Sequence, residues 1–316
     1  MDNSSKSNNF ALIVTSEKMT TISIIIVNFN TLHVLQPCID SIVEHTIGVD
    51  YEIIVVDNGS SDGSVKVLAE DKRIVFVPID DNLGFGRANN IGLKHAQGEY
   101  IFFLNSDTLL KNNAIKMLYD FARNYNGKLG ALGCILEDRD GNRIHSYGRF
   151  PHMSDDIHKL IVNPIKKGLR LYLPSTIIYP KHWMKVHYIT GADLFVSRHV
   201  LDDCGAFNPA FFMYYEETEM QYRFARHNYE NVLLNGPRII HLEGEGGNIG
   251  SSKFIHDTLR QQKSEYIYFK LTEPYWKYCL FRIIHPILRQ TVWLNPNISF
   301  SDKWKFVKQL FITIKI

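Results

Sequence analysis

The chain contains two short, continuous runs of Ile and Val that each end in polar residues, ISIIIVN at 22–28 and YEIIVVDN at 51–58. An unbroken apolar run of this length is typical of a strand buried on both faces, and such strands occur in parallel sheets covered by helices. The segment between them, 35–44, reads as a helix. Together the three segments predict a β-α-β unit.

The same alternation continues along the chain. Residues 65–71 and 88–96 are predicted as helices, and 73–79 and 99–107 as strands. Repetition of this unit indicates an α/β fold with an open, doubly wound, mainly parallel sheet. After about residue 118 the rhythm changes, and mixed strands with long loops are expected up to about residue 180. A further strand is expected to end near 240–241.

Charge and cysteine usage exclude several classes of protein. There are 35 basic and 33 acidic side chains, so the formal charge of +2 gives no reason to expect a nucleic-acid partner. The four cysteines show no metal-ligand spacing, which favours a reducing, cytoplasmic location. No apolar run approaches the ~20 residues of a membrane helix. Residues 1–18 lack the features of a secretory signal and are predicted to be a disordered tail.

The C-terminal segment is basic and aromatic. Residues 260–316 hold ten Lys or Arg and three acids, with Trp276, Trp293 and Trp304 among them. Such an amphipathic segment can lie on an anionic membrane surface, here the inner face of the cell membrane. A helical cap on the core, or a homodimer contact, is the alternative interpretation.

Polar side chains follow the predicted strands at their carboxyl ends, the edge at which open α/β sheets bind ligands. An acid in the position of Asp57 can bind a ribose or a base, although it can equally satisfy the amides of its own turn. Asp107 suits Mg²⁺ or Mn²⁺, with a helix N-cap as the alternative. The strand-end residues are Asn28, Asn30, Asp57, Asn58, Asn105, Ser106 and Asp107.

A glycine-rich segment, DNLGFGRANNIG at 81–92, follows the third strand. Gly84, Arg87 and Asn90 stand at a predicted loop-to-helix junction, where exposed amides and a guanidinium can meet a diphosphate. A surface loop is the alternative. The segment lacks the GxGxxG spacing and does not follow the first strand, which argues against a dinucleotide-binding domain.

Three glutamates, Glu216, Glu217 and Glu219, interrupt an aromatic stretch, FFMYYEETEMQYR. Burial and like-charge neighbours raise the pKa of a carboxyl group, which suits a general base. The alternative is a helix start, with acids at the positive end of the dipole and Arg223 as a partner. His241 is a candidate metal or phosphate ligand, or a structural histidine.

Four segments together resemble the inverting glycosyltransferases of family 2, in particular the rhamnosyltransferase-like branch that builds bacterial surface polysaccharides. They are SIIIVNFN with VVDNGSSDGS, DNLGFGRANNIG, the LNSD form of the DxD motif, and ITGADLFVSR through FFMYYEETEMQYR to IIH. They occur in family order and span roughly residues 20–245.

The resemblance implies a GT-A domain at 19–250, with a nucleotide-binding half at 19–107 and an acceptor half at 108–250, followed by a helical extension at 251–316. It implies a nucleotide-sugar donor, dTDP-rhamnose or a UDP-hexose, and a glycan or lipid-linked glycan acceptor. Asp57 and the neighbourhood of Asn28 would hold the nucleoside. The candidate nucleotide-sugar-binding residues are Asn28, Asn30, Asp57, Asn58, Gly84, Arg87, Asn90, Asn105 and Ser106. Mg²⁺ or Mn²⁺ would lie at Asp107 with His241 nearby, and Glu217 or Glu216 would be the catalytic base. Tyr147, Arg149, Asp193 and Glu219 fall in the acceptor half, where folding roles are equally plausible.

Two departures from the family pattern stand out. Asn105 replaces the first acid of DxD, and Glu217 and Glu219 stand where Asp is usual. One alternative function is therefore a nucleotide-sugar-binding scaffold that has lost catalysis, which would bind donor without releasing nucleotide diphosphate. A sugar-phosphate nucleotidyltransferase is disfavoured, because NFNTLHV follows the first strand where that class needs a glycine-rich basic loop.

Overall fold

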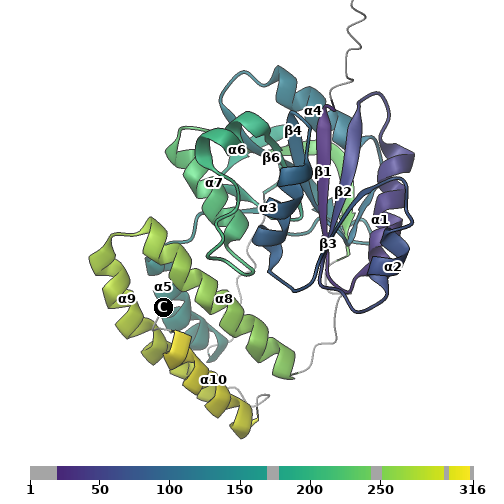
Figure 1. The fold of residues 1–316 in the computed structure, drawn as a ribbon. Coiled ribbons are helices and arrows are strands. Elements are labelled where there is room, and N and C mark those ends of the chain that lie inside the picture. The colour runs from purple at the N-terminus through teal and green to yellow at the C-terminus, as the bar shows by residue number, and fades with distance from the viewer. Residues whose placement is uncertain (1–19, 169–177, 243–250, 295–298, 314–316) are drawn as a thin grey trace, which may run out of the picture.

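The structure, a computed structural model, describes residues 20–168, 178–242, 251–294 and 299–313 (Figure 1). The tail predicted for 1–18 lies outside these residues. The strands are β1 (Ile22–Asn28), β2 (Tyr51–Asn58), β3 (Val75–Ile79), β4 (Tyr100–Asn105), β5 (Thr108–Leu110), β6 (Leu129–Glu137), β7 (Tyr147–Gly148), β8 (Trp183–Val186), β9 (Tyr188–Ile189), β10 (Asp193–Ser197) and β11 (Glu230–His241). The helices are α1 (Leu32–His45), α2 (Ser64–Leu68), α3 (Phe85–His95), α4 (Ala114–Asn124), α5 (Met153–Gly168), α6 (Arg198–Cys204), α7 (Glu216–Arg226), α8 (Ser251–Thr272), α9 (Tyr275–Leu288), the 3₁₀ helix η1 (Arg289–Leu294) and α10 (Phe300–Thr313).

The central sheet has the strand order β3-β2-β1-β4-β10-β6-β11-β5, with β8 paired to β11. Strands β3, β2, β1 and β4 are parallel, and β10 runs antiparallel to both β4 and β6. The register sets Asn28 beside Asp57 and Val27 beside Asn105. The polar strand ends therefore meet at one edge, and the predicted mainly parallel α/β fold is confirmed.

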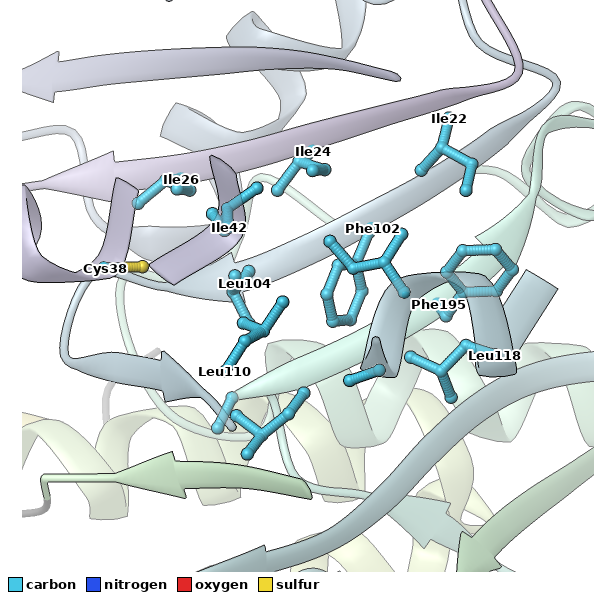
Figure 2. Packing of buried hydrophobic residues seen from close by; sticks show 14 of the residues in the cluster. Ile22, Ile24, Ile26, Cys38, Ile42, Phe102, Leu104, Leu110, Leu118 and Phe195 are labelled. Atoms are coloured by element: carbon cyan, nitrogen blue, oxygen red, sulfur yellow. The ribbon is translucent and has the colours of Figure 1, made fainter. Parts of the chain in front are cut away.

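Both faces of the sheet are buried, as the unbroken apolar runs predicted. On one face, Ile22, Ile24 and Ile26 of β1 pack with side chains of α1 and α4 (Figure 2). On the other face, Ile25 packs with Val56 and with side chains of α3, α6 and α7. Each fully buried Ile contributes roughly 1.5–3 kcal/mol of transfer free energy, so the two layers fix the sheet firmly beneath its polar edge.

A second group of helices, α5, α8, α9 and α10, lies beside the α/β unit (Figure 1). Its interior contains Met153 of α5, Tyr268 and Phe269 of α8, and Phe281 of α9. The helical C-terminal extension is thus confirmed. Helix α5 was not expected, because the sequence between residues 118 and 180 predicted strands and loops. Within the described residues, no helix has both the length and the apolar character needed to cross a bilayer.

Candidate active site

The two predicted metal ligands, Asp107 and His241, meet Asn105, a predicted nucleotide-sugar-binding residue, at the sheet edge. Asn105 ends β4, Asp107 follows it, and His241 ends β11. His241 Nε2 lies 3.2 Å from Asp107 Oδ1 and 3.3 Å from Asn105 Nδ2. The antiparallel pairing of β5 with β11, which sets Thr108 opposite His241, brings these distant segments together. Asp107 and His241 remain partly accessible, with 26% and 13% of their side-chain surfaces exposed.

The chemistry of this donor set fits a divalent cation. A carboxylate oxygen and an imidazole nitrogen within 3.2 Å of each other can share one ion. Mg²⁺ commonly uses only one or two protein carboxylates, with substrate phosphates completing its shell, and imidazole suits transition metals. Asp107 and His241 are therefore the residues that would hold Mg²⁺ or Mn²⁺.

A cavity of about 930 Å³ opens beside this group. Asn105 and His241 line it from the sheet edge, and Glu216 and Glu217 line it from the start of α7. Because Asp107 contacts His241, the candidate cation site and the candidate base share one cavity. Helices α5 and α8 supply Asp155, Asp156, His158 and Gln261 to the lining of the same cavity.

The start of α7 has an unusual backbone. Tyr214 and Tyr215, directly before Glu216, both have positive φ, of 71° and 67°. Bulky residues rarely adopt this conformation, and such outliers concentrate at functional sites. The turn is held from α8, since Ser264 Oγ donates to the Met213 carbonyl (2.7 Å) and Tyr215 Oη donates to Glu265 Oε1 (3.2 Å). It directs the first residues of α7 into the cavity.

Glu216 and Glu217 occupy different environments. Glu216 is 4% exposed, and its Oε2 has no hydrogen-bond partner within the described part of the chain. Burial, reinforced by the charge of Glu217, raises the pKa of Glu216 well above the ordinary value. Glu217 is only partly buried and accepts a hydrogen bond from Thr218 Oγ1 (3.2 Å), and burial also raises its pKa. Since two adjacent carboxylates cannot both ionise easily, the accessible Glu217 is the better placed to exchange a proton.

The predicted nucleoside residues form a hydrogen-bonded chain along the sheet edge. Asn28 Nδ2 donates to Asp57 Oδ2 (2.6 Å), and Asp57 Oδ1 accepts from the Ser60 amide (3.0 Å). Thr31 Oγ1 joins Asn28 Oδ1 (2.7 Å) to Ser106 Oγ (2.9 Å). Asn28 and Asp57 are fully buried, so the turn-amide role of Asp57 is present in the structure, while its contact with a nucleoside stays a prediction.

The two remaining strand-end residues brace neighbouring loops. Asn30, at φ 57°, accepts from the Ser61 amide (2.7 Å), and Asn58 accepts from the Leu83 amide (2.9 Å). Asn58 thereby ties the end of β2 to the glycine-rich segment. Both contacts shape the rim of the edge.

The glycine-rich segment contacts protein backbone. Arg87 Nε donates to the Pro209 carbonyl (2.7 Å), and the Asn90 amide pairs with both backbone groups of Phe207. Gly84, at φ 87°, has no room for a Cβ, which would overlap the Phe212 carbonyl. These contacts join the segment to the 207–212 loop that leads to α7, and the diphosphate role of Gly84, Arg87 and Asn90 stays a prediction.

One of the four predicted acceptor residues, Arg149, lines the cavity. Tyr147 lies outside the lining and donates its hydroxyl to the Ile178 carbonyl (2.5 Å). Asp193 is fully buried in β10 and accepts from the Cys134 amide (2.6 Å). Glu219 is buried and ion-paired to Arg223 (2.9 Å). The hydroxyl of Tyr147 and the carboxylates of Asp193 and Glu219 thus bind protein groups, and the acceptor role of the four residues stays a prediction.

Sequence reasoning missed several cavity residues. His145 and Tyr188 line the cavity, as do His158 of α5 and Gln261 of α8. Tyr188 directly precedes the ITGADLFVSR segment, which was the available signal for it, whereas no quoted motif includes His145, His158 or Gln261. Only amphipathic spacing in 153–168 could have revealed α5, and nothing in the sequence shows that it folds against α8 beside the sheet edge.

The mainly parallel sheet, its antiparallel strand β10 and its acid-bearing edge define the GT-A fold class. The family model "Glycosyl transferase family 2" matches residues 23–188, more than half of the chain, and the protein belongs to this family.

Similarity to individual proteins is partial. The chain is 34% identical over 125 residues to the poly(ribitol-phosphate) beta-N-acetylglucosaminyltransferase TarP of Staphylococcus aureus (strain N315), covering 36% of this chain and 38% of TarP. It is 34% identical over 102 residues to the glycosyltransferase GlyG of Streptococcus pneumoniae serotype 4 (31% and 34%). It is 27% identical over 212 residues to the low-salt glycan biosynthesis hexosyltransferase Agl10 of Haloferax volcanii (66% and 62%). In each case the match spans less than two thirds of the relative.

Proposed function

We propose that the protein is a metal-dependent, inverting glycosyltransferase that moves a sugar from a nucleotide diphosphate onto an acceptor hydroxyl. The observation that supports this most directly is the shared cavity: Glu217 and His241 line it, and Asp107 lies 3.2 Å from His241. A proton acceptor and a cation-binding pair thus face one space.

The residues divide the reaction between them. Glu217 removes the proton of the acceptor hydroxyl while the new bond forms at the anomeric carbon and the bond to the diphosphate breaks, so a single displacement inverts the centre. Asp107 and His241 would hold the divalent ion, which supplies charge stabilisation for the leaving diphosphate. Burial and the neighbouring Glu217 raise the pKa of Glu216, which disfavours a second negative charge on the pair.

The proposed acceptor is a glycan or lipid-linked glycan of the bacterial cell surface, modified on the cytoplasmic side. Support comes from the names of relatives, which include a poly(ribitol-phosphate) beta-N-acetylglucosaminyltransferase and a glycan biosynthesis hexosyltransferase. These names favour a hexose or N-acetylhexosamine donor, and a UDP-hexose is one proposed donor. The rhamnosyl branch, with dTDP-rhamnose, remains the other proposed donor.

Purified protein with Mn²⁺ and a panel of nucleotide sugars tests the proposal through release of nucleotide diphosphate. We expect Asp107→Ala and Glu217→Gln each to lower turnover by ~10² or more, since a positioned base and leaving-group stabilisation are each worth about that factor. Glu99→Gln, an exposed acid before β4, is the matched control and should be neutral. Donor binding without diphosphate release by the wild type would indicate a scaffold and overturn the enzyme assignment.

A further inference from the structure

Helix α9 is apolar on two opposite sides. Tyr278, Phe281 and His285 are buried against the rest of the helical group. Trp276, Leu280, Ile283 and Ile287 point outward and are 67%, 49%, 64% and 63% exposed. Their spacing of four, three and four residues sets all four on one face of a helix, so α9 presents a continuous apolar stripe to its surroundings.

Helix α10 repeats this arrangement. Phe306 and Leu310 are buried with Leu259 of α8. Phe300, Trp304 and Phe311 are 71%, 56% and 53% exposed, and their spacing of four and seven residues again gives one outward face. We call the exposed residues of the two helices the outer stripe: Trp276, Leu280, Ile283, Ile287, Phe300, Trp304 and Phe311.

Positive charge accompanies the outer stripe. Helices α9 and α10 contain five Lys or Arg and one acid, Asp302. The Lys277 ammonium lies 5.7 Å from the centre of the Trp276 ring. Lys308 is exposed and follows Trp304 by four residues, which puts the two on the same face of α10. Large apolar side chains bordered by lysines are typical of helices that lie in the interface of an anionic bilayer.

We propose that the outer stripe binds an anionic phospholipid surface. The charge selects this occupant over a second copy of the chain, because an isologous contact would bring two identical positively charged rims together. The proposal deepens the proposed function: α5, which packs against α9, and α8 both line the cavity, so attachment through this helical group holds the cavity next to a lipid-linked acceptor.

The test is co-sedimentation of the full chain with vesicles of phosphatidylcholine and phosphatidylglycerol, compared with phosphatidylcholine alone. We expect binding to the anionic vesicles, with a blue shift of tryptophan emission as Trp276 and Trp304 enter the interface. Ile283→Glu should lower partitioning at least about tenfold. Ile47→Glu replaces an equally accessible Ile (69% exposed) in the α1–β2 connection and should leave it unchanged.

The contribution of charge is tested with the double variant Lys305→Gln, Lys308→Gln. Its partitioning onto anionic vesicles should fall about fivefold for each charge removed, and added salt should weaken binding of the wild type in the same way. The proposal would be overturned if Ile47→Glu and Ile283→Glu lowered vesicle binding equally, or if the wild type did not bind the anionic vesicles. So would a dimer in light scattering that Ile283→Glu dissociates. Diphosphate release by the same variants is measured separately. Lipid binding without turnover would contradict the proposed function but would still support the proposed membrane-binding surface.

Discussion

Glu216 and Glu217, the two adjacent glutamates at the start of α7, differ in burial. Burial raises the pKa of both, and the charge of Glu217 further raises that of Glu216. The sequence left the choice of base open, since it shows two neighbouring carboxylates and no accessibility. The structure distinguishes them, because Glu217 is the more exposed to the cavity.

This difference predicts a pH profile. A general base works only when ionised, so activity should be lost as pH falls through the pKa of Glu217, and the acidic limb of kcat/KM should lie above the ~4.3 of an unperturbed Glu. Glu216→Gln should keep substantial activity with this limb in place. A diphosphate-release assay across pH measures this limb in the wild type and in Glu216→Gln. If Glu216→Gln were inactive and Glu217→Gln active, Glu216 would be the base.

Asp193 leads to a stability prediction. Burial in β10 raises its pKa to about 7, opposed by the hydrogen bond from the Cys134 amide. Between the unfolded pKa of ~3.9 and about 7, the folded state keeps a proton that the unfolded state has lost, so stability falls as pH rises through this window. From pH 5 to pH 8 this group should cost about 3 kcal/mol.

Asp193→Asn keeps an acceptor for the Cys134 amide and removes the titration. Relative to the wild type, the variant should therefore gain about 3 kcal/mol in free energy of unfolding between pH 5 and pH 8. Urea denaturation at pH 5 and pH 8 measures the free energy of unfolding of both proteins. EDTA is present so that metal binding does not contribute to it. An identical pH dependence in both proteins would show that Asp193 is not the titrating group.

At the scale of elements, the parts predicted well are those specified locally. Strands β1, β2 and β4 follow from unbroken apolar runs, and α7 begins at Glu216 with acids in its first turn and Arg223 and Arg226 in its last. Contacts between distant segments could not be foreseen. The Pro209 carbonyl that Arg87 binds lies 122 residues away, and β5 is a three-residue strand that pairs with β11.

Helix α8 acts on the active site through the turn before α7. Loss of the Ser264 hydroxyl should leave the Met213 carbonyl without its partner and loosen the strained Tyr214–Tyr215 backbone. Ser264→Ala is expected to cost about 1 kcal/mol of stability and to lower kcat roughly tenfold, with a smaller change in KM for the donor.

Steady-state kinetics and thermal denaturation of Ser264→Ala measure both effects. Ser301→Ala, an exposed serine in α10, is the control and should change neither quantity. A kcat equal to that of the wild type would show that the turn keeps its geometry without the hydrogen bond from Ser264.

For the whole molecule, the cavity joins three parts that fold from separate regions of the chain: the sheet edge, the start of α7 and the wall formed by α5 and α8. On the proposed function, a donor would span the predicted nucleoside edge and the proposed cation site and so would bind the folded state alone. Such a ligand stabilises the folded state by mass action, by about 2.7 kcal/mol at a concentration of 100 Kd.

A thermal-shift panel of UDP- and dTDP-sugars, with and without Mn²⁺, therefore reports on the donor and on the ion together. The preferred donor should raise Tm more with Mn²⁺ than without it, and Asp107→Ala should abolish this increment while keeping the part due to the nucleoside. Asp202→Ala, an exposed acid on α6, should behave as the wild type.

If Asp107→Ala kept the full Mn²⁺ increment, the ion would have to bind elsewhere. Asp203, Cys204 and His227, whose ligand atoms lie within 4.8 Å of one another, are the group to examine first, and loss of the increment in His227→Ala would move the cation site there.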